Sequence, residues 1–194
     1  MKKIEMKIQA LPYAVEEAMN RLRVNIKFCG KNTKKIMIIS SVPNEGKSTV
    51  SVNLWKMLAE YEDVVYKTNI DQGYIVSVSN LLENPSTLLE DPRMEELLDR
   101  LGEDYRYVIV DSPPLDSVSD GALVASYCDG VILVVRSGMT SRKLVRQSLQ
   151  QLERVGCRLP GTVLNRVETG GRAYKKYYGR YGDYSSYYGG NSDK

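Results

Sequence analysis

The residues best suited to chemistry are gathered in one short segment, 41–49, which reads Ser-Val-Pro-Asn-Glu-Gly-Lys-Ser-Thr. It follows the phosphate-loop pattern GxxxxGK[ST], except that Ser41 stands in place of the first glycine. Gly46 lets the backbone approach a phosphate without a Cβ, and the N–H groups that open the next helix form an anion cradle. Lys47 can reach the β- and γ-phosphates of a nucleotide, and the Ser48 hydroxyl is a ligand for Mg²⁺. The alternative interpretation is an ordinary Gly-Lys-Ser turn.

Asp111 is the natural second half of such a site. It follows the apolar run Tyr107-Val108-Ile109-Val110, which is typical of a buried strand. A carboxylate at the C-terminal end of a parallel strand lies where such sheets bind ligands, so Asp111 can hold Mg²⁺ or its waters. The alternative is a turn or helix-cap aspartate placed before Pro113.

Composition excludes several other kinds of chemistry. The chain has 194 residues and no histidine, which rules out a histidine base or a histidine metal site. Its three cysteines form no CxxC pair, so we expect a reducing, cytoplasmic setting. A net charge of +3 is too small to argue for nucleic acid. No apolar run approaches the roughly 18–20 residues that span a bilayer, so we expect membrane contact only through a partner.

The elements around these residues alternate between strands and helices. We predict strands at 35–40, 107–111, 131–135 and 162–165, with a further strand possible at 74–78. We predict helices at about 13–29, 47–60, 94–101 and 140–155. This order indicates an α/β fold, with a mostly parallel sheet and helices on both faces.

The last part of the chain has a different composition. Residues 1–167 carry the predicted elements, whereas 168–194 contain no aliphatic residue larger than Ala173 and cannot bury enough apolar surface to order themselves. We therefore predict a folded domain followed by a flexible tail. Seven of the 14 tyrosines lie in this tail: Tyr174, Tyr177, Tyr178, Tyr181, Tyr184, Tyr187 and Tyr188. The alternative for the tail is a low-complexity adhesive or RNA-binding segment.

Four segments and the tail, in this order, carry a family resemblance. They are SSVPNEGKSTVSVNL, YVIVDSPPLDSVSDG, CDGVILVVRSGMTS and GTVLNRV. Together they resemble the bacterial tyrosine kinases (BY-kinases) of capsule and exopolysaccharide synthesis, in particular the separate CpsD/CapB-type cytoplasmic proteins. The resemblance covers nearly the whole chain and implies a P-loop NTPase-like, MinD/ParA-related fold.

The resemblance also implies roles for individual residues. Glu45, Gly46, Lys47 and Ser48 would form the site for the phosphates of MgATP, and Thr49 would support them. Asp111 would act near the metal. Asn165 looks like the residue that contacts adenine, although an ordinary strand-end asparagine is an equally good interpretation.

The implied activity is an ATP-dependent protein-tyrosine kinase that autophosphorylates its tail tyrosines between subunits and regulates polysaccharide synthesis. The implied partners are a transmembrane chain-length regulator that activates the kinase, further copies of the chain and a cognate tyrosine phosphatase. The helix at 12–29 resembles the family's oligomerisation helix, whose Glu-x-x-Arg-x-x-Arg pattern falls on Glu17, Asn20 and Arg23; Asn20 departs from it. Packing of this helix on the sheet is the alternative.

The segment between Ala59 and Tyr74 differs from the family pattern. The family has a strand here that ends in Asp-x-Asp, the Walker A′ motif, and this chain has no such motif. Asp63 and Asp71 are the nearest acids, and neither follows an apolar strand. We therefore expect a sheet one strand short. The alternative function is a catalytically impaired nucleotide-binding scaffold or a MinD/ParA-like ATPase.

Overall fold

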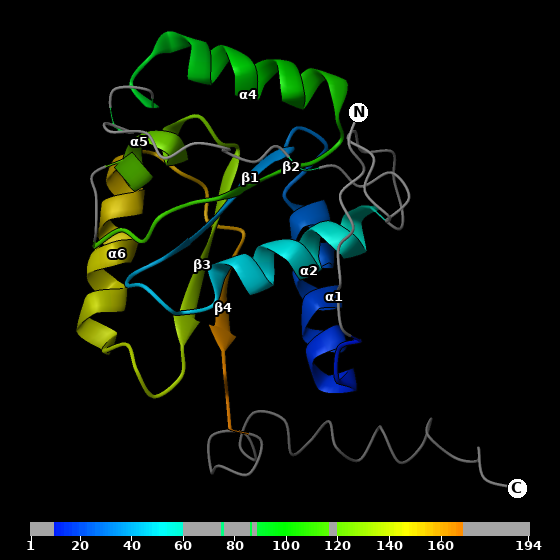
Figure 1. Ribbon diagram of the computed structural model, residues 1–194, viewed down its shortest axis with the longest axis vertical. Coiled ribbons are helices and arrows are strands. Elements are labelled where there is room, and N and C mark those ends of the chain that lie inside the picture. The colour runs from blue at the N-terminus through cyan, green and yellow to red at the C-terminus, as the bar shows by residue number, and fades with distance from the viewer. Residues whose placement is uncertain (1–9, 60–74, 76–85, 87–88, 117–119, 169–194) are drawn as a thin grey trace, which may run out of the picture.

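A parallel sheet of four strands forms the centre of the computed structural model, which describes residues 10–59, 75, 86, 89–116 and 120–168 (Figure 1). The strands are β1 (Lys35–Ser40), β2 (Val108–Asp111), β3 (Gly130–Arg136) and β4 (Gly161–Asn165). Their order is β2-β1-β3-β4, and every neighbouring pair is parallel. The four predicted strands and the parallel sheet are thus confirmed.

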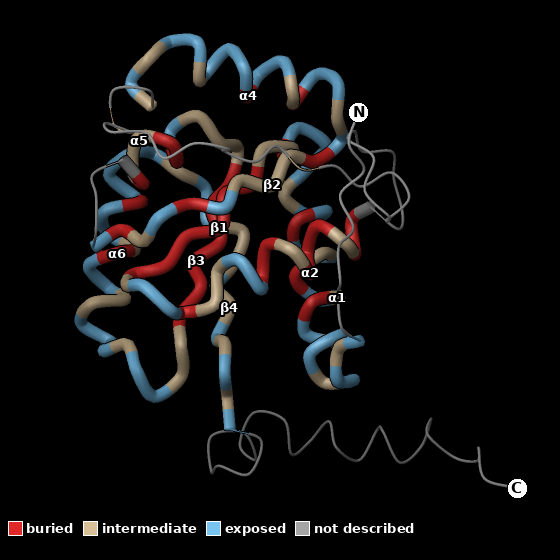
Figure 2. Tube along the Cα trace, viewed as in Figure 1, coloured by how far each residue is buried: buried red, intermediate tan, exposed pale blue. Residues whose placement is uncertain are grey.

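The two central strands are the most deeply buried part of the sheet. Ile36 to Ile39 of β1 and Val131 to Val134 of β3 are fully buried, as expected of short apolar strands covered on both faces. The strands at the two ends of this order, β2 and β4, keep partly exposed residues (Figure 2). The phosphate loop therefore follows one of the two most deeply buried strands of the sheet.

Helices cover both faces of the sheet. On one face, buried residues of α1 (Tyr13–Phe28) and α2 (Lys47–Ala59) pack with Ile36, Ile38 and Ile132. On the other face, α5 (Asp120–Ser126) and α6 (Arg142–Arg154) pack with the side chains of β1 and β3 that point the opposite way. The α/β architecture predicted from the sequence is confirmed.

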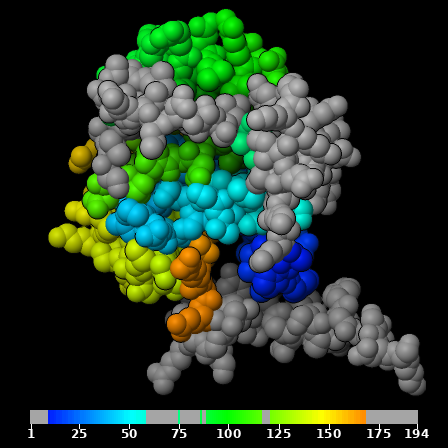
Figure 3. Space-filling view, viewed as in Figure 1, coloured from blue at the N-terminus to red at the C-terminus, as the bar shows by residue number. Residues whose placement is uncertain are grey.

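One further helix, α4 (Pro92–Asp104), lies at one end of the molecule (Figure 3). Its start is fixed by Asp91, whose side chain accepts a hydrogen bond from the Arg93 amide, and by proline at the first helical position. We expected a shorter helix, 94–101, ending at Gly102, and this was wrong. Gly102 lies within the helix and is buried, and its carbonyl accepts a hydrogen bond from Lys34 Nζ at 2.7 Å.

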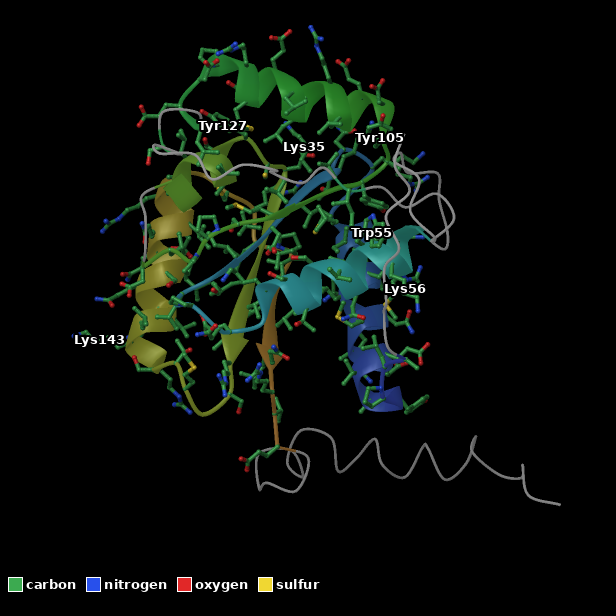
Figure 4. All side chains as sticks on the ribbon, viewed as in Figure 1. Lys35, Trp55, Lys56, Tyr105, Tyr127 and Lys143 are labelled. Carbon is green, nitrogen blue, oxygen red and sulfur yellow. The ribbon has the colours of Figure 1, made fainter. Side chains whose placement is uncertain are left out.

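The side chain of Lys35 also ties α4 to the sheet. It lies beneath the helix (Figure 4), and its Nζ is 2.5 Å from Asp99 Oδ1.

The short helix α5 was not predicted. Over the residues that the structure describes, no helix has the length and apolar character needed to cross a membrane.

The shortened middle of the chain leaves no gap between the strands of this sheet, because β1 pairs directly with β2 on one side and with β3 on the other. Among the described residues, β2 is the last strand on its side. Of the possible strand at 74–78 the structure describes only Ile75, which is not in a strand. The acids Asp63 and Asp71 and the tail tyrosines lie outside the described residues.

Candidate phosphate-binding site

The phosphate loop connects the carboxyl end of β1 to the first turn of α2. Two residues give the loop its sharp turn: Asn44 has φ 64° and Gly46 has φ 94°. Asparagine and glycine are the residues that adopt this left-handed region at least cost. The turn thus brings the N–H groups at the start of α2 to the edge of the sheet, where an anion can bind them.

Lys47 lies folded over its own loop. Its Nζ donates a hydrogen bond to Ser40 Oγ at 2.9 Å, and Ser40 Oγ donates to the carbonyl of Val42 at 2.7 Å. Partial burial lowers the pKa of Lys47, while the nearby carboxylates of Asp111 and Glu45 act in the opposite direction. The ammonium group is therefore held within the loop and close to acids that its charge can complement.

Ser48 and Asp111 meet at the same corner. Ser48 Oγ donates to Asp111 Oδ2 at 2.6 Å, and the Ser51 hydroxyl lies 3.3 Å from Oδ1 of the same carboxylate. Hydroxyl and carboxylate oxygens suit Mg²⁺, which usually takes only one or two protein ligands and completes its shell with phosphates and waters. The residues present fit this metal, and the pairing predicted from the sequence is brought together.

Ser41, which replaces the first glycine of the pattern, is accommodated by its surroundings. It is fully buried, and its hydroxyl accepts a hydrogen bond from Ser148 Oγ of α6 at 2.8 Å. Its carbonyl accepts a further bond from the amide of Asp116 at 3.1 Å. The departure from the pattern thus ties the loop to α6, a contact that the sequence alone did not reveal.

Asn165, at the end of β4, touches the loop directly. Its Nδ2 donates to the carbonyl of Glu45 at 2.8 Å, and its Oδ1 accepts from the amide of Arg166 at 2.9 Å. A Cβ added to Gly46 would overlap Asn165 Nδ2. Because an amide has two N–H groups and two lone pairs, Asn165 keeps one donor and one acceptor for a ligand.

A cavity of about 260 Å³ opens beside this asparagine, and its lining is mostly apolar. It lies between α1, α2 and the end of β4, with Ala14, Ala18, Thr49, Asn53, Val163 and Asn165 among the residues that line it. An apolar recess with a few polar groups is typical of a small-molecule site. Thr49 places this recess next to the phosphate loop.

Glu45 has its side chain inside the protein. It is fully buried, and its carboxyl oxygens accept hydrogen bonds from the amides of Val42 and Arg136 at 2.9 and 3.0 Å and from the hydroxyl of Thr140. Sequence reasoning grouped Glu45 with the nucleotide-binding residues and gave no sign of Thr140 as its partner. In the structure, the side chain supports the loop from behind.

Known proteins with similar sequences and structures indicate the family of this chain. No protein-family model matches the chain. The tyrosine-protein kinase CpsD of Streptococcus agalactiae is 29% identical over an aligned length of 206 positions, which takes in 86% of this chain and 90% of CpsD. The solved kinase domain of VpsO is 26% identical with a TM-score of 0.66, covering 81% of this chain and all of that domain. The tyrosine-protein kinase Etk of Escherichia coli (strain K12) is 30% identical over 78% of this chain, which matches 26% of Etk. The chain belongs to the bacterial tyrosine kinase family.

A second solved structure, the chimeric protein CapA2B2, is similar to this bacterial tyrosine kinase over 79% of the chain and 85% of its own length. Its TM-score is 0.72 and its identity 25%. The P-loop NTPase-like fold expected from the resemblance is therefore confirmed. Within the part of this kinase that the structure describes, two acids act to raise the pKa of Lys47 against the larger lowering by burial: Asp111 and the buried Glu45.

Proposed function

We propose that the chain is an ATP-dependent protein-tyrosine kinase that phosphorylates its own C-terminal tyrosine cluster and acts in the synthesis of capsular or extracellular polysaccharide. The observation that carries the proposal is the hydrogen bond of 2.6 Å from Ser48 Oγ to Asp111 Oδ2, next to the loop that holds Lys47. The similarity to CpsD along 86% of the chain supports tyrosine as the acceptor.

The substrate ATP would extend from the loop into the neighbouring cavity. Its phosphates suit the N–H groups at the start of α2 and the ammonium of Lys47. Its base suits the apolar recess between α1 and β4, where Asn165 offers one free donor and one free acceptor. Thr49 lies between these two parts of the site.

The reaction is an in-line transfer of the γ-phosphoryl group. The phenolic oxygen of a tail tyrosine attacks the γ-phosphorus, the bond to the β–γ bridging oxygen breaks, ADP leaves and the phenolic proton passes to solvent. Lys47 offsets the negative charge on the phosphates. Ser48 and Asp111 are the residues that would hold Mg²⁺, which would supply positive charge to offset the negative charge of the phosphates.

Partners complete this proposal. A transmembrane chain-length regulator would activate the kinase and bring it to the inner face of the plasma membrane. Other copies of the chain would present their tyrosines to its site, and a cognate phosphatase would reverse the modification. Family membership supports these partners.

The test is a phosphotyrosine immunoblot of the purified chain incubated with MgATP and an activator segment, followed by mass spectrometry of the tail. We expect phosphate on several of the seven tail tyrosines, and none in a Lys47→Ala variant. An unlabelled wild-type chain, under conditions in which CpsD of Streptococcus agalactiae labels itself, would contradict the kinase proposal.

A second function is a nucleotide-binding scaffold or a MinD/ParA-like ATPase without tyrosine transfer. It is favoured by the composition of the phosphate-binding site. Among the described residues, Asp111 is the only exposed carboxylate whose charge acts to raise the pKa of Lys47. This function predicts binding of MgATP that Lys47→Ala abolishes, together with a tail that stays unmodified.

A further inference from the structure

The side chain of Glu45 lies inside the protein, although the residue belongs to the phosphate loop. It is an acid with no exposed surface, one residue before the glycine at the tightest point of the turn. Burying a carboxyl group is costly unless its oxygens find donors. Here both oxygens do, because one accepts from the amide of Val42 and the other from the amide of Arg136 and the hydroxyl of Thr140.

These donors come from two different parts of the fold. Val42 belongs to the phosphate loop itself, so its bond closes the loop on the Glu45 side chain at 2.9 Å. Arg136 ends β3, and Thr140 lies in the connection from β3 to α6. The Glu45 side chain therefore fastens the loop to its neighbouring strand across 91 and 95 positions of sequence.

The backbone of the same residue makes a third link. The Glu45 carbonyl accepts from Asn165, at the end of β4. The space-filling view shows the three segments side by side on one face: the blue-to-cyan loop and α2, the yellow connection into α6 and the orange end of β4 (Figure 3). One residue thus joins the carboxyl ends of β1, β3 and β4.

Phosphate loops work because their donors are already aimed at the position of the phosphate before it arrives. Gly46 and Lys47 follow Glu45 directly, so a shift of Glu45 moves both the turn and the ammonium group. We propose that Glu45 is a positioning residue for phosphate binding and transfer, acting through its link to Thr140 on the β3–α6 connection. This inference rests on the proposed function, since its effect is on the handling of nucleotide phosphates.

Two substitutions loosen this link from opposite ends. Glu45→Gln keeps the size of the side chain. If the oxygen of the new glutamine still accepts from Arg136 and Thr140, its NH₂ group faces the Val42 amide, so that two donors meet. Thr140→Val keeps the shape of the threonine and removes its hydroxyl. Ser141→Ala is the matched control, because it removes the next hydroxyl, which caps α6 by accepting a hydrogen bond from the Leu144 amide. Among the described residues, this hydroxyl makes no hydrogen bond with the phosphate loop.

The experiment titrates MgADP into the full-length chain and its three variants by calorimetry, at a temperature where circular dichroism shows each one folded. We expect roughly tenfold weaker binding for Glu45→Gln and about threefold or more for Thr140→Val, as expected for buried groups that lose a partner. Ser141→Ala should bind within about twofold of wild type. Autophosphorylation by Glu45→Gln should stay slow even at saturating MgATP, because the misplacement persists in the bound state, whereas a role in stability alone would leave this rate unchanged.

The outcomes separate this inference from the proposed function. Wild-type chain that binds no MgADP overturns both. Wild-type binding, with folded Glu45→Gln and Thr140→Val variants that bind and react as wild type does, overturns the positioning role and leaves the proposed function intact. If Glu45→Gln does not fold, the comparison of Thr140→Val with Ser141→Ala decides, and equal affinities there overturn the inference.

Discussion

Lys47 carries the charge on which nucleotide binding depends, and its environment acts on that charge in two ways. Partial burial favours the neutral amine, whereas the carboxylates of Asp111 and Glu45 favour the ammonium, and burial prevails, so the pKa is lowered. Between this lowered pKa and the ordinary lysine value, the unfolded chain binds more protons at this residue than the folded chain. Lys47 therefore makes the free energy of unfolding rise with pH across that window.

Binding of phosphate should have the opposite dependence on pH. The nucleotide needs the charged form of Lys47, so we expect affinity for MgADP to fall as pH rises through the lowered pKa, earlier than for a lysine of ordinary pKa. Lys47→Arg keeps its charge throughout this range, and its affinity should change less with pH. Calorimetric titrations from about pH 7 to 10 would measure both profiles, and parallel profiles would contradict the role given to Lys47.

At the scale of the elements, the site depends on how β1 turns into α2. Gly46 combines a left-handed φ of 94° with close contact to Asn165, so a side chain there meets two obstacles. Gly138, in the connection from β3 to α6, has φ 73° and open space around it. A side chain at Gly138 would cause backbone strain alone, whereas one at Gly46 would cause the same kind of strain and also a clash with Asn165. Comparing substitutions at the two positions therefore isolates the effect of the clash.

We expect Gly46→Ala to lose MgADP binding, because its Cβ can be accommodated only if Asn165 moves off the loop. Gly138→Ala should lose only about 1–2 kcal/mol of stability, the cost of a left-handed residue with a side chain. Calorimetry and urea denaturation of both variants would test this. Equal nucleotide affinities in the two would show that Asn165 does not restrict the turn.

The sequence predicted the strands to within a residue or so because the central strands are short apolar runs buried on both faces. The helices were harder where tertiary contacts decide their ends. Helix α4 continues through Gly102, where Lys34, just before β1, bonds the Gly102 carbonyl and Lys35 of β1 pairs with Asp99. No local pattern reveals these contacts. Helix α5 has only 7 residues, too few to establish a helical period.

The candidate site was predictable only where its residues belong to a local sequence pattern. The loop and Asp111 carry a spacing and a strand context that can be recognised in the sequence. Their partners Ser51, Thr140 and Ser148 are ordinary hydroxyl residues on helices and connections. They meet the site across 60, 95 and 107 positions of sequence, so only the folded chain identifies them.

Helix α1 offers a test of packing at the same scale. Ile26 is fully buried in the cluster between α1, α2 and the sheet, whereas Phe28, two residues later, is 83% exposed. We expect Ile26→Ala to lower the free energy of unfolding by about 2–5 kcal/mol, and Phe28→Ala to change it by less than about 0.5 kcal/mol. Chemical denaturation would measure both, and similar losses would mean that α1 is seated differently on the sheet.

At the scale of the whole molecule, α1 has two faces with different roles. Its inner face packs on α2 through Met19, Leu22 and Ile26, which agrees with the packing interpretation of this helix. Its outer face leaves Tyr13, at 70% exposure, and Phe28 in solvent. Packing therefore uses only part of the helix, and large apolar side chains remain available to a second copy of the chain.

If copies of the chain associate through this outer face, the double substitution Tyr13→Ser and Phe28→Ser should reduce the mass measured by light scattering. The folded protomer should be unaffected, because neither side chain lies in the core. Leu97→Ser is the matched control, since Leu97 on α4 is 45% exposed and belongs to a different surface. A loss of self-association confined to the α1 variant would place the contact on this helix. An unchanged mass, or an equal loss in the Leu97 variant, would remove α1 from the assembly and leave it as a packing element alone.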